Sequence, residues 1–282
     1  MTSASDSAIT LSVAHIPAEI PADPERRART VYVVVDVIRA TTTLTVMFER
    51  GVRRVWVARD VEAARAARDS LTGALVAGEV AAVAPSDFDC GNSPEEWGSL
   101  PEKIVAGRDI LFSTTNGARA LHASRGGGPI FAGSLRNATA VSRAALAAAR
   151  GLVADGAGAG VLVVCSGREN RPAEDDSLCA AWLIATLEEV AHGEGTQVTP
   201  DTAAQTARAM LAASEWGSQY AERWIYDRLA ASEPARDVLD VGLGADLAWC
   251  AAVDASTAVP AVTGYDATRD LLIVEPTSSA HP

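Results

Sequence analysis

Aromatic residues and closely spaced cysteines are both scarce in this sequence. Phe, Trp and Tyr make up 5% of the 282 residues, and the four cysteines lie far apart with no CxxC pair. That spacing gives no support for a zinc ribbon and favours a reducing compartment. No apolar run reaches the ~18 residues of a membrane-spanning helix, and the first residues lack the basic and apolar regions of a signal peptide. We therefore expect a cytoplasmic protein with no membrane partner.

Basic residues are outnumbered by acidic ones. The chain has 24 Lys and Arg against 36 Asp and Glu, which gives a formal net charge of −12 at pH 7. Nucleic acids and anionic membranes bind through basic faces, so neither is an expected partner. A small anionic ligand stays open, because arginines, backbone N–H groups and a divalent cation can reverse the field within one cleft.

Several familiar hydrolase motifs are absent. The four histidines form no HxH or HExxH pair, which disfavours zinc and di-iron hydrolases. Asp36 is not followed two residues later by a second Asp, so the paired-Asp pattern of haloacid dehalogenase-type phosphatases fails. The sequence contains neither a GxSxG elbow nor a GxxxxGK[ST] loop.

The sequence does contain enough apolar residues, 48%, to bury a sizeable core. After a polar start with three prolines, short apolar runs alternate with helical segments, which is typical of βαβ units. We predict one α/β domain over residues 1–282, with three α/β/α layers, a largely parallel or mixed sheet, and a helical flank or lid at about 200–232. The expected strands are Val31–Asp36, Arg54–Ala58, Ala74–Ala77, Asp109–Ser113, Pro129–Ala132, Val161–Cys165, Ala261–Thr263 and Leu271–Val274, and the expected helices between them are Val61–Ser70, Asn137–Arg150 and Asp175–Ala191.

Unusual polar segments follow the predicted strands, where open α/β sheets bind ligands. Asp36 ends the first strand and is a good ligand for a hard cation. Arg39 offers a planar fork for phosphate or sulfonate oxygens. Thr41, Thr42 and Thr43 open a helix and could hold an anion with hydroxyl and N–H groups. In the simpler alternative, Thr41 only caps the helix and Arg39 is a surface charge.

Two further strand exits repeat this pattern. Thr114, Thr115 and Asn116 precede a helix that carries Arg119, and Ser134 and Asn137 open the next one. A plain turn with a capped helix would look similar. The Asp36–Thr43 and Ser113–Arg119 segments, as two such strand exits on one sheet, nevertheless indicate a divided anion site.

Carboxylates form the last group of candidates. Glu79 follows a strand end, and Glu174, Asp175 and Asp176 begin a helix. Adjacent acids there can simply complement the helix dipole. They also supply oxygen ligands at the edge of the sheet, as a Mg²⁺ site requires.

Taken together, these motifs resemble the 2-phosphosulfolactate phosphatases. The resemblance runs from about Val31 to Asp176 and resumes at Leu243–Pro260. It is carried by the segments Asp36–Thr43, Gly78-Glu79, Phe88–Pro94, Thr114–Arg119 and Gly133–Asn137. Two positions depart from the family pattern: Asp175 stands where Glu is usual, and Ala118 where Thr is usual.

The resemblance implies a Mg²⁺-dependent phosphatase that converts (R)-2-phospho-3-sulfolactate to 3-sulfolactate and phosphate, a step of coenzyme M biosynthesis in some members. The partner is then a small anionic phosphorylated hydroxy acid.

As a hypothesis, some subset of Asp36, Glu79 and Asp176 holds the metal, and Asp36, Arg39 and Asp176 are the catalytic residues. One anionic end of the substrate is bound by Arg39 and the threonines 41–43, and the other by Thr114, Thr115, Asn116 and Arg119, with Ser134 and Asn137 in the same substrate-binding set. The nucleophile is either metal-activated water or Asp36 itself.

Two rival functions stay open at this point. Cys165 and Arg171 fit the Cys-x5-Arg spacing of cysteine-dependent phosphatases, in which a thiolate attacks phosphate without a metal. A non-catalytic phospho-acid-binding protein would also use an anion cradle, but it gains nothing from several nearby carboxylates. A homo-oligomeric state is left open as well.

Overall fold

The computed structural model describes residues 9–153, 158–212 and 221–277. The strands are β1 Ile9–Ala14, β2 Thr30–Val35, β3 Arg54–Ala58, β4 Leu75–Gly78, β5 Asp109–Ser113, β6 Ile130–Gly133, β7 Gly160–Cys165, β8 Val198–Pro200, β9 Pro260–Asp266 and β10 Leu271–Pro276. The helices are α1 Pro24–Ala28, α2 Ala40–Glu49, α3 Val61–Ala67, α4 Pro94–Ser99, α5 Glu102–Val105, α6 Gly117–Ala123, α7 Ala138–Leu152, α8 Glu174–Gly193, α9 Thr202–Ala212, α10 Ala221–Ala230, α11 Glu233–Asp240 and α12 Asp246–Ala251.

Strand β2 shows why the fold is layered. All six of its residues are buried, as its unbroken apolar run predicts. Val31, Val33 and Val35 point into one core, which α7, α8 and α9 help to fill. Tyr32 and Val34 point into a second core on the opposite face, shared with α2, α4 and α6. Burial on both faces requires helices on both sides of the sheet.

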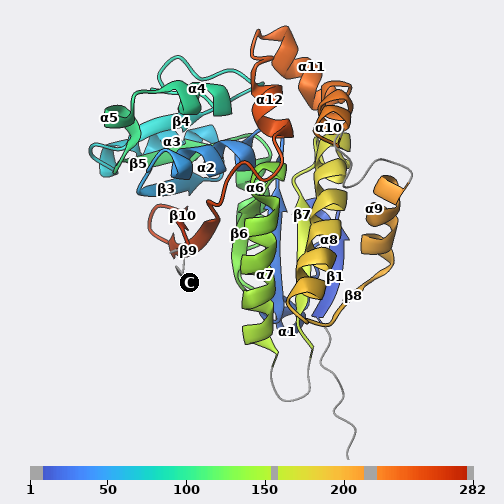
Figure 1. The fold of residues 1–282 in the computed structure, drawn as a ribbon. Coiled ribbons are helices and arrows are strands. Elements are labelled where there is room, and N and C mark those ends of the chain that lie inside the picture. Colours follow the sequence, from blue (N-terminus) through green and yellow to red (C-terminus); the bar gives the residue numbers. More distant parts are fainter. Residues whose placement is uncertain (1–8, 154–157, 213–220, 278–282) are drawn as a thin grey trace, which may run out of the picture.

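The described strands form one sheet in the order β4-β5-β3-β10-β9-β6-β2-β7-β1-β8. The order contains two parallel blocks: β4, β5 and β3, and then β6, β2, β7, β1 and β8. They appear as two lobes in Figure 1, with α11 and α12 at the top between them.

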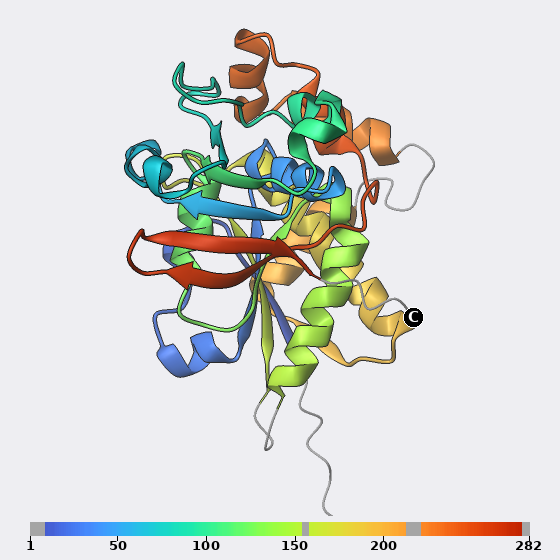
Figure 2. The same cartoon turned by 90° about the vertical axis from the view of Figure 1, so that its left-hand side faces the viewer.

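The antiparallel hairpin β9–β10 joins the two blocks. Strand β10 pairs with β3 on one side, and Figure 2 shows the red hairpin beside that blue strand. On the other side, β9 meets β6 through the single pair Phe131 and Ala261. Residues that follow strands of both blocks line a common space.

These observations confirm the predicted α/β class with a mixed sheet flanked by helices. Each strand predicted from the sequence is present, with bounds shifted by a few residues at most. No strand was predicted in the polar, proline-containing start, but Ile9–Ala14 forms the strand β1. Its Ser12 hydroxyl donates to Asp201, which places a polar residue on this strand near the sheet edge.

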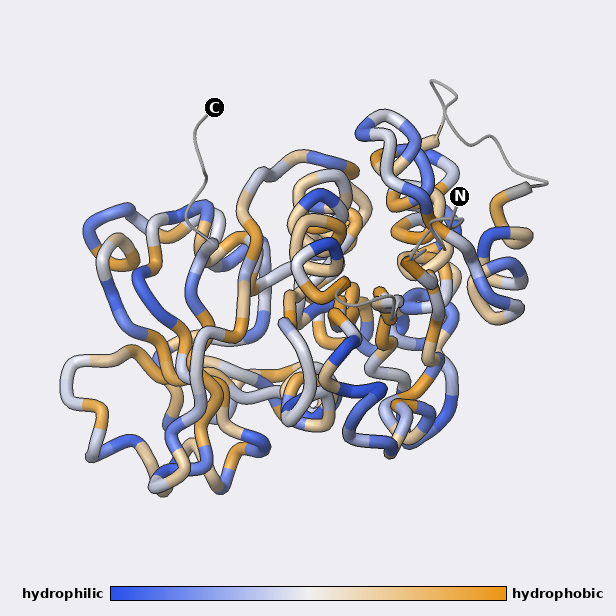
Figure 3. The backbone as a smooth tube through the Cα atoms, turned by 90° about the horizontal axis from the view of Figure 1, so that it is seen from below, coloured by the Kyte–Doolittle hydropathy of each residue, from blue (hydrophilic) through white to orange (hydrophobic). Residues whose placement is uncertain are grey.

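The predicted helical flank at about 200–232 corresponds to α9 and α10, and its residues 213–220 lie outside the described ones. Helix α9 packs on α8 and β1, and α10 packs on α12 and α8. Figure 3 shows the hydrophobic stretches mainly inside the molecule and the hydrophilic ones mainly on outer loops. None of the described helices is long and apolar enough to cross a bilayer.

Candidate active site

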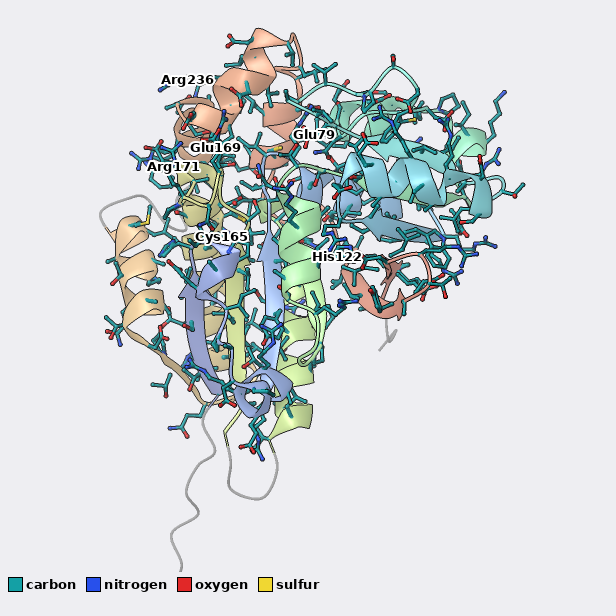
Figure 4. All side chains as sticks on the ribbon, turned by 180° about the vertical axis from the view of Figure 1, so that it is seen from behind. Glu79, His122, Cys165, Glu169, Arg171 and Arg236 are labelled. Atoms are coloured by element: carbon teal, nitrogen blue, oxygen red, sulfur yellow. The ribbon has the colours of Figure 1, made fainter. Side chains whose placement is uncertain are left out.

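A cleft of about 330 Å³ opens where the two blocks meet. Its walls are the loops that follow β2, β4, β5 and β7, together with α11. The lining residues are Asp36, Ile38, Arg39, Glu79, Val80, Ala81, Ala82, Asn92, Thr115, Asn116, Ser166, Gly167, Arg168, Glu169, Ala173, Asp175, Asp176, Pro234, Asp237 and Val238. In Figure 4, Glu79 lies toward one lobe, and Glu169, Arg171 and Arg236 lie toward the other. The cleft is therefore built from strand ends, as open α/β folds build ligand sites.

Four carboxylates dominate the floor of this cleft. Asp36, Glu79, Asp175 and Asp176 all line it and are all at least nine-tenths buried. Burial, reinforced by the charges of Asp176 and Glu79, raises the pKa of Asp36 to about 7. Burial also raises the pKa of Asp175 and of Asp176, with each affected by a neighbouring carboxylate. Such a concentration of negative charge is unfavourable unless protons or a cation neutralise it.

Two of the carboxylates tie the walls together through the backbone. Asp176 accepts from the N–H of Val37 (3.0 Å), from the Ser166 hydroxyl (2.8 Å) and from the N–H of Gly167 (3.0 Å). Glu79 accepts from the N–H groups of Thr115 (2.7 Å) and Ala82 (3.0 Å). These bonds fix the loops after β2, β4, β5 and β7 around one centre.

Two glycines allow the backbone to approach this centre closely. A Cβ on Gly117 would lie 2.6 Å from Asp36 Oδ2, so only glycine lets the start of α6 reach that carboxylate. A Cβ on Gly78 would lie 2.0 Å from the Ser113 carbonyl oxygen, and its φ of +151° disfavours other residues as well. Gly117 thus lets α6 approach Asp36, and Gly78 lets β4 lie close to β5, just before Glu79.

The cleft also contains acceptors without donors. Asp175 Oδ1 and Asn92 Oδ1 are both buried and have no hydrogen-bond partner. An unsatisfied buried oxygen costs about 1–3 kcal/mol, and a positively charged group could satisfy both of these oxygens. Carboxylate and amide oxygens are the donors that Mg²⁺ prefers. The donor set therefore fits a hard divalent cation, although no three acidic, His or Cys side chains of the described ranges are already grouped closely enough to hold an ion.

Arg39 reaches the cleft but is committed to other partners. Its guanidinium donates to Asp246 Oδ2 (2.7 Å) and to the Ala82 carbonyl (2.6 Å). The Arg39 and Asp246 side chains are only 2% and 1% exposed. Asp246 accepts in addition from the Ser93 hydroxyl at 2.5 Å. This network joins α2, α12, the start of α4 and the loop after β4. Arg39 is therefore a buried residue, and the alternative that it is only a surface charge is wrong.

We expect Arg39→Lys to lower the free energy of unfolding by about 1.5–3 kcal/mol, because one ammonium group cannot reproduce both charge-assisted bonds of the fork. Chemical denaturation of the two proteins measures the difference. Arg53→Lys is the matched control, since Arg53 is 64% exposed in its pair with Asp109 and such pairs contribute about 0–1 kcal/mol. Equal losses of unfolding free energy in both variants would show that the buried Arg39 network stabilises the fold no more than an exposed ion pair does.

The threonines at the start of α2 do not line the cleft. Thr41 and Thr42 donate their hydroxyls to the carbonyl oxygens of Asp36 and Val37, and Thr43 donates to that of Asn92. All three side chains are fully buried. In this structure they fasten the loop after β2 and are not directed at a ligand.

The other substrate-binding candidates divide into two groups. Thr115 and Asn116 line the cleft, whereas Thr114 uses its hydroxyl to accept from the N–H of Ala118. Arg119 is exposed on α6 and lies outside the cleft lining.

Ser134 and Asn137 are bonded to each other at 3.1 Å and are buried away from the cleft. The Asn137 amide donates to the carbonyl oxygens of Ala132 and Ala258, so it braces the start of α7 against the segment before β9.

The cysteine alternative gains no support from the geometry. Cys165 is fully buried at the end of β7, and burial raises the pKa of its thiol well above the ordinary value. Nucleophilic cysteines require the opposite shift. Arg171 is exposed and pairs with Glu169 at 3.1 Å. Figure 4 shows Cys165 well below Arg171.

Several residues of the cleft were not assigned a role from the sequence. Asp175 was named as a carboxylate at a helix start, but only its neighbour Asp176 was predicted as a metal ligand. Asn92 lies in the Gly91–Pro94 turn. Arg168 and Asp237 are 69 residues apart and form an ion pair in the cleft lining. No local sequence pattern predicts this pair.

Comparison with known proteins now adds a decisive observation. A family model described as 2-phosphosulpholactate phosphatase matches residues 14–264. The chain belongs to this family. Its motifs from Val31 to Pro260 all fall within the matched range.

Two curated relatives have the same family name. A protein of Thermus thermophilus named probable 2-phosphosulfolactate phosphatase is 36% identical over 255 residues, which cover 90% of this chain and 94% of the relative. A protein of the same name from Symbiobacterium thermophilum is 35% identical over 241 residues, covering 85% and 94%. The family is one of phosphoric monoester hydrolases, which favours catalysis over a non-catalytic binding protein.

Proposed function

We propose that this chain is a Mg²⁺-dependent phosphatase that hydrolyses 2-phosphosulfolactate to 3-sulfolactate and phosphate. The observation that supports the proposal best is the meeting of four buried carboxylates and two unpartnered oxygens in one cleft of a chain that belongs to this family. Pure anion binding would not place so many negative charges there, whereas a cation-assisted reaction of a phosphate ester would use them.

Asp36 and Asp175 are the proposed principal ligands of the metal, because both are buried in the cleft lining and Asp175 Oδ1 has no hydrogen-bond partner. Glu79 and Asp176 complete the set, each through a lone pair that its backbone contacts leave free. When bound, Mg²⁺ supplies charge neutralisation for the phosphoryl oxygens and lowers the pKa of a coordinated water.

The chain's own groups provide the rest of the binding site. Thr115 and Asn116 line the cleft, and their hydroxyl and amide groups are the proposed donors to phosphoryl oxygens. Pro234 and Val238 of α11 present apolar surface on the opposite side and limit water access. Arg39 acts as a positioning residue through Asp246 and the Ala82 carbonyl, and it holds the loop that carries Glu79.

The proposal is tested by phosphate release from 2-phosphosulfolactate, from phospholactate (which lacks the sulfonate) and from phenyl phosphate. We expect turnover of 2-phosphosulfolactate in Mg²⁺, its loss in EDTA, and its return when Mg²⁺ is restored in excess. The panel also ranks the substrates, because only the first carries all three anionic groups.

Cys165→Ser serves as the companion variant and is expected to keep most of the activity. Undiminished turnover in EDTA, combined with complete loss in a folded Cys165→Ser protein, would reject the metal site and favour the thiolate mechanism.

A further inference from the structure

The charges that line the cleft are unbalanced. Its acidic side chains are Asp36, Glu79, Glu169, Asp175, Asp176 and Asp237, and its basic ones are Arg39 and Arg168. The proposed substrate brings a phosphate together with a second and a third acid group on neighbouring carbons. A cation at the carboxylate floor can neutralise the phosphate end. The remaining acid groups then require a positive partner elsewhere in the cleft.

Of the two arginines in the cleft lining, Arg168 is the one able to exchange partners. Arg39 is 2% exposed and holds Asp246 and Ala82, so its release would leave a buried charge unpaired. The Arg168 side chain is 28% exposed and pairs with Asp237 and, at 3.7 Å, with Glu233, both on α11. Those carboxylates are 47% and 60% exposed, and ion pairs so exposed to solvent contribute little to stability.

The backbone holds Arg168 at a fixed distance from the carboxylate floor. Two residues earlier, Ser166 donates its hydroxyl to Asp176 at 2.8 Å. The N–H groups and carbonyls of Arg168 and Arg171 bond to each other at 2.8 and 2.9 Å and close a tight turn. Glu169 and Asn170 inside that turn have φ values of +49° and +59°. Strained turns of this kind persist where the surroundings impose them and occur often at ligand sites.

Helix α11 does not have to move for an exchange to occur. Its Ala235 and Val238 are buried and keep the helix packed, whereas Asp237 contributes its carboxylate from the exposed side. A rotamer change of Asp237 is sufficient to free the Arg168 guanidinium. The Asp237 carboxylate thus stands in for an oxyanion of the ligand, with one of its oxygens bonded to Arg168 Nη1.

We propose that Arg168 binds the acid group of the substrate next to the phosphate ester, in the place that Asp237 occupies in the ligand-free protein. The fork binds two oxygens of a carboxylate or sulfonate, and this contact selects phosphorylated acids over plain phosphate esters. The inference rests on the proposed function and names the residue that determines its substrate class.

The test compares Arg168→Ala with Asp237→Asn, because the proposal gives them opposite effects. Arg168→Ala should raise KM for 2-phosphosulfolactate roughly tenfold or more, with little change in kcat and little change with phenyl phosphate. Asp237→Asn should lower that KM or leave it unchanged, since it removes a competing carboxylate. Arg236→Ala is the matched control: Arg236 is an exposed arginine of α11 outside the cleft lining and should leave KM as it is.

A purely structural ion pair makes a different prediction. It would shift KM in the same direction in Arg168→Ala and Asp237→Asn, and it would affect both substrates alike; either result overturns the proposal. Calorimetric binding of 3-sulfolactate separates this inference from the proposed function. If the wild type releases no phosphate, a Kd that rises in Arg168→Ala still supports Arg168, and an unchanged Kd rejects it. Should Arg168→Ala fold poorly, Arg168→Gln replaces it in each comparison.

Discussion

Asp36→Asn is expected to lower kcat/KM for 2-phosphosulfolactate by roughly 10²–10³-fold, the range observed when one group that stabilises transition-state charge is removed. The amide has nearly the shape of the carboxylate, but its one oxygen can accept from only one of the two backbone N–H groups, of Ala40 and Gly117, that donate to Asp36. The variant also loses the negative charge at the centre of the cleft. The affinity for Mg²⁺, measured by calorimetry, should fall with the activity.

The matched control for this variant is Asp87→Asn. Asp87 is exposed and pairs with Arg65 at 2.9 Å, well outside the cleft lining, so wild-type kinetics are expected. Near-wild-type activity in Asp36→Asn, with the protein folded, would remove Asp36 from the catalytic set.

The metal-free protein is expected to lose stability as the pH rises from about 5 to about 8. Asp36 has an ordinary pKa of 3.8 in the unfolded chain and a raised pKa of about 7 in the fold. Between these values the folded state holds a proton that the unfolded state has released, so each added pH unit favours unfolding by up to about 1.4 kcal/mol for this group. Asp175 and Asp176 shift in the same direction and add to the slope.

Thermal unfolding in EDTA across this pH range measures the effect. Because a bound cation removes the repulsion among the carboxylates, Mg²⁺ should raise Tm more at pH 8 than at pH 6, and Asp36→Asn should flatten the pH profile in EDTA. A Tm that increases steadily from pH 5 to pH 8 without metal would show that the carboxylates are not buried close to one another as described.

Features that depend on neighbouring residues in the chain could be predicted from the sequence. The unbroken apolar run before Asp36 was sufficient to predict a doubly buried strand, and strand ends were sufficient to bring Asp36, Glu79 and Asp176 to one cleft. The same threonine-rich helix start is expected for an anion cradle and for a cap. Only the positions of nearby carbonyl groups, such as those of Asp36 and Val37, decide between them.

Partners far apart in the chain were beyond prediction. Arg39 fits a phosphate as well as a carboxylate, and its actual partner, Asp246, lies 207 residues away. The pair between Arg168 and Asp237 depends likewise on where α11 packs. The cleft wall at residues 234–238 lies just beyond the predicted flank at 200–232. Apolar periodicity predicts that a segment is helical, but it does not show which helix covers a ligand site.

The β9–β10 hairpin has a consequence for the order of folding. The two parallel blocks that form the cleft walls are complete before β9 and β10, which follow the other described strands in the chain. During synthesis, each block can bury its own apolar residues while the two have no strand between them. We therefore expect the repulsion among the carboxylates of the two walls to be complete only after the last strands have inserted, at a step where a cation can offset it.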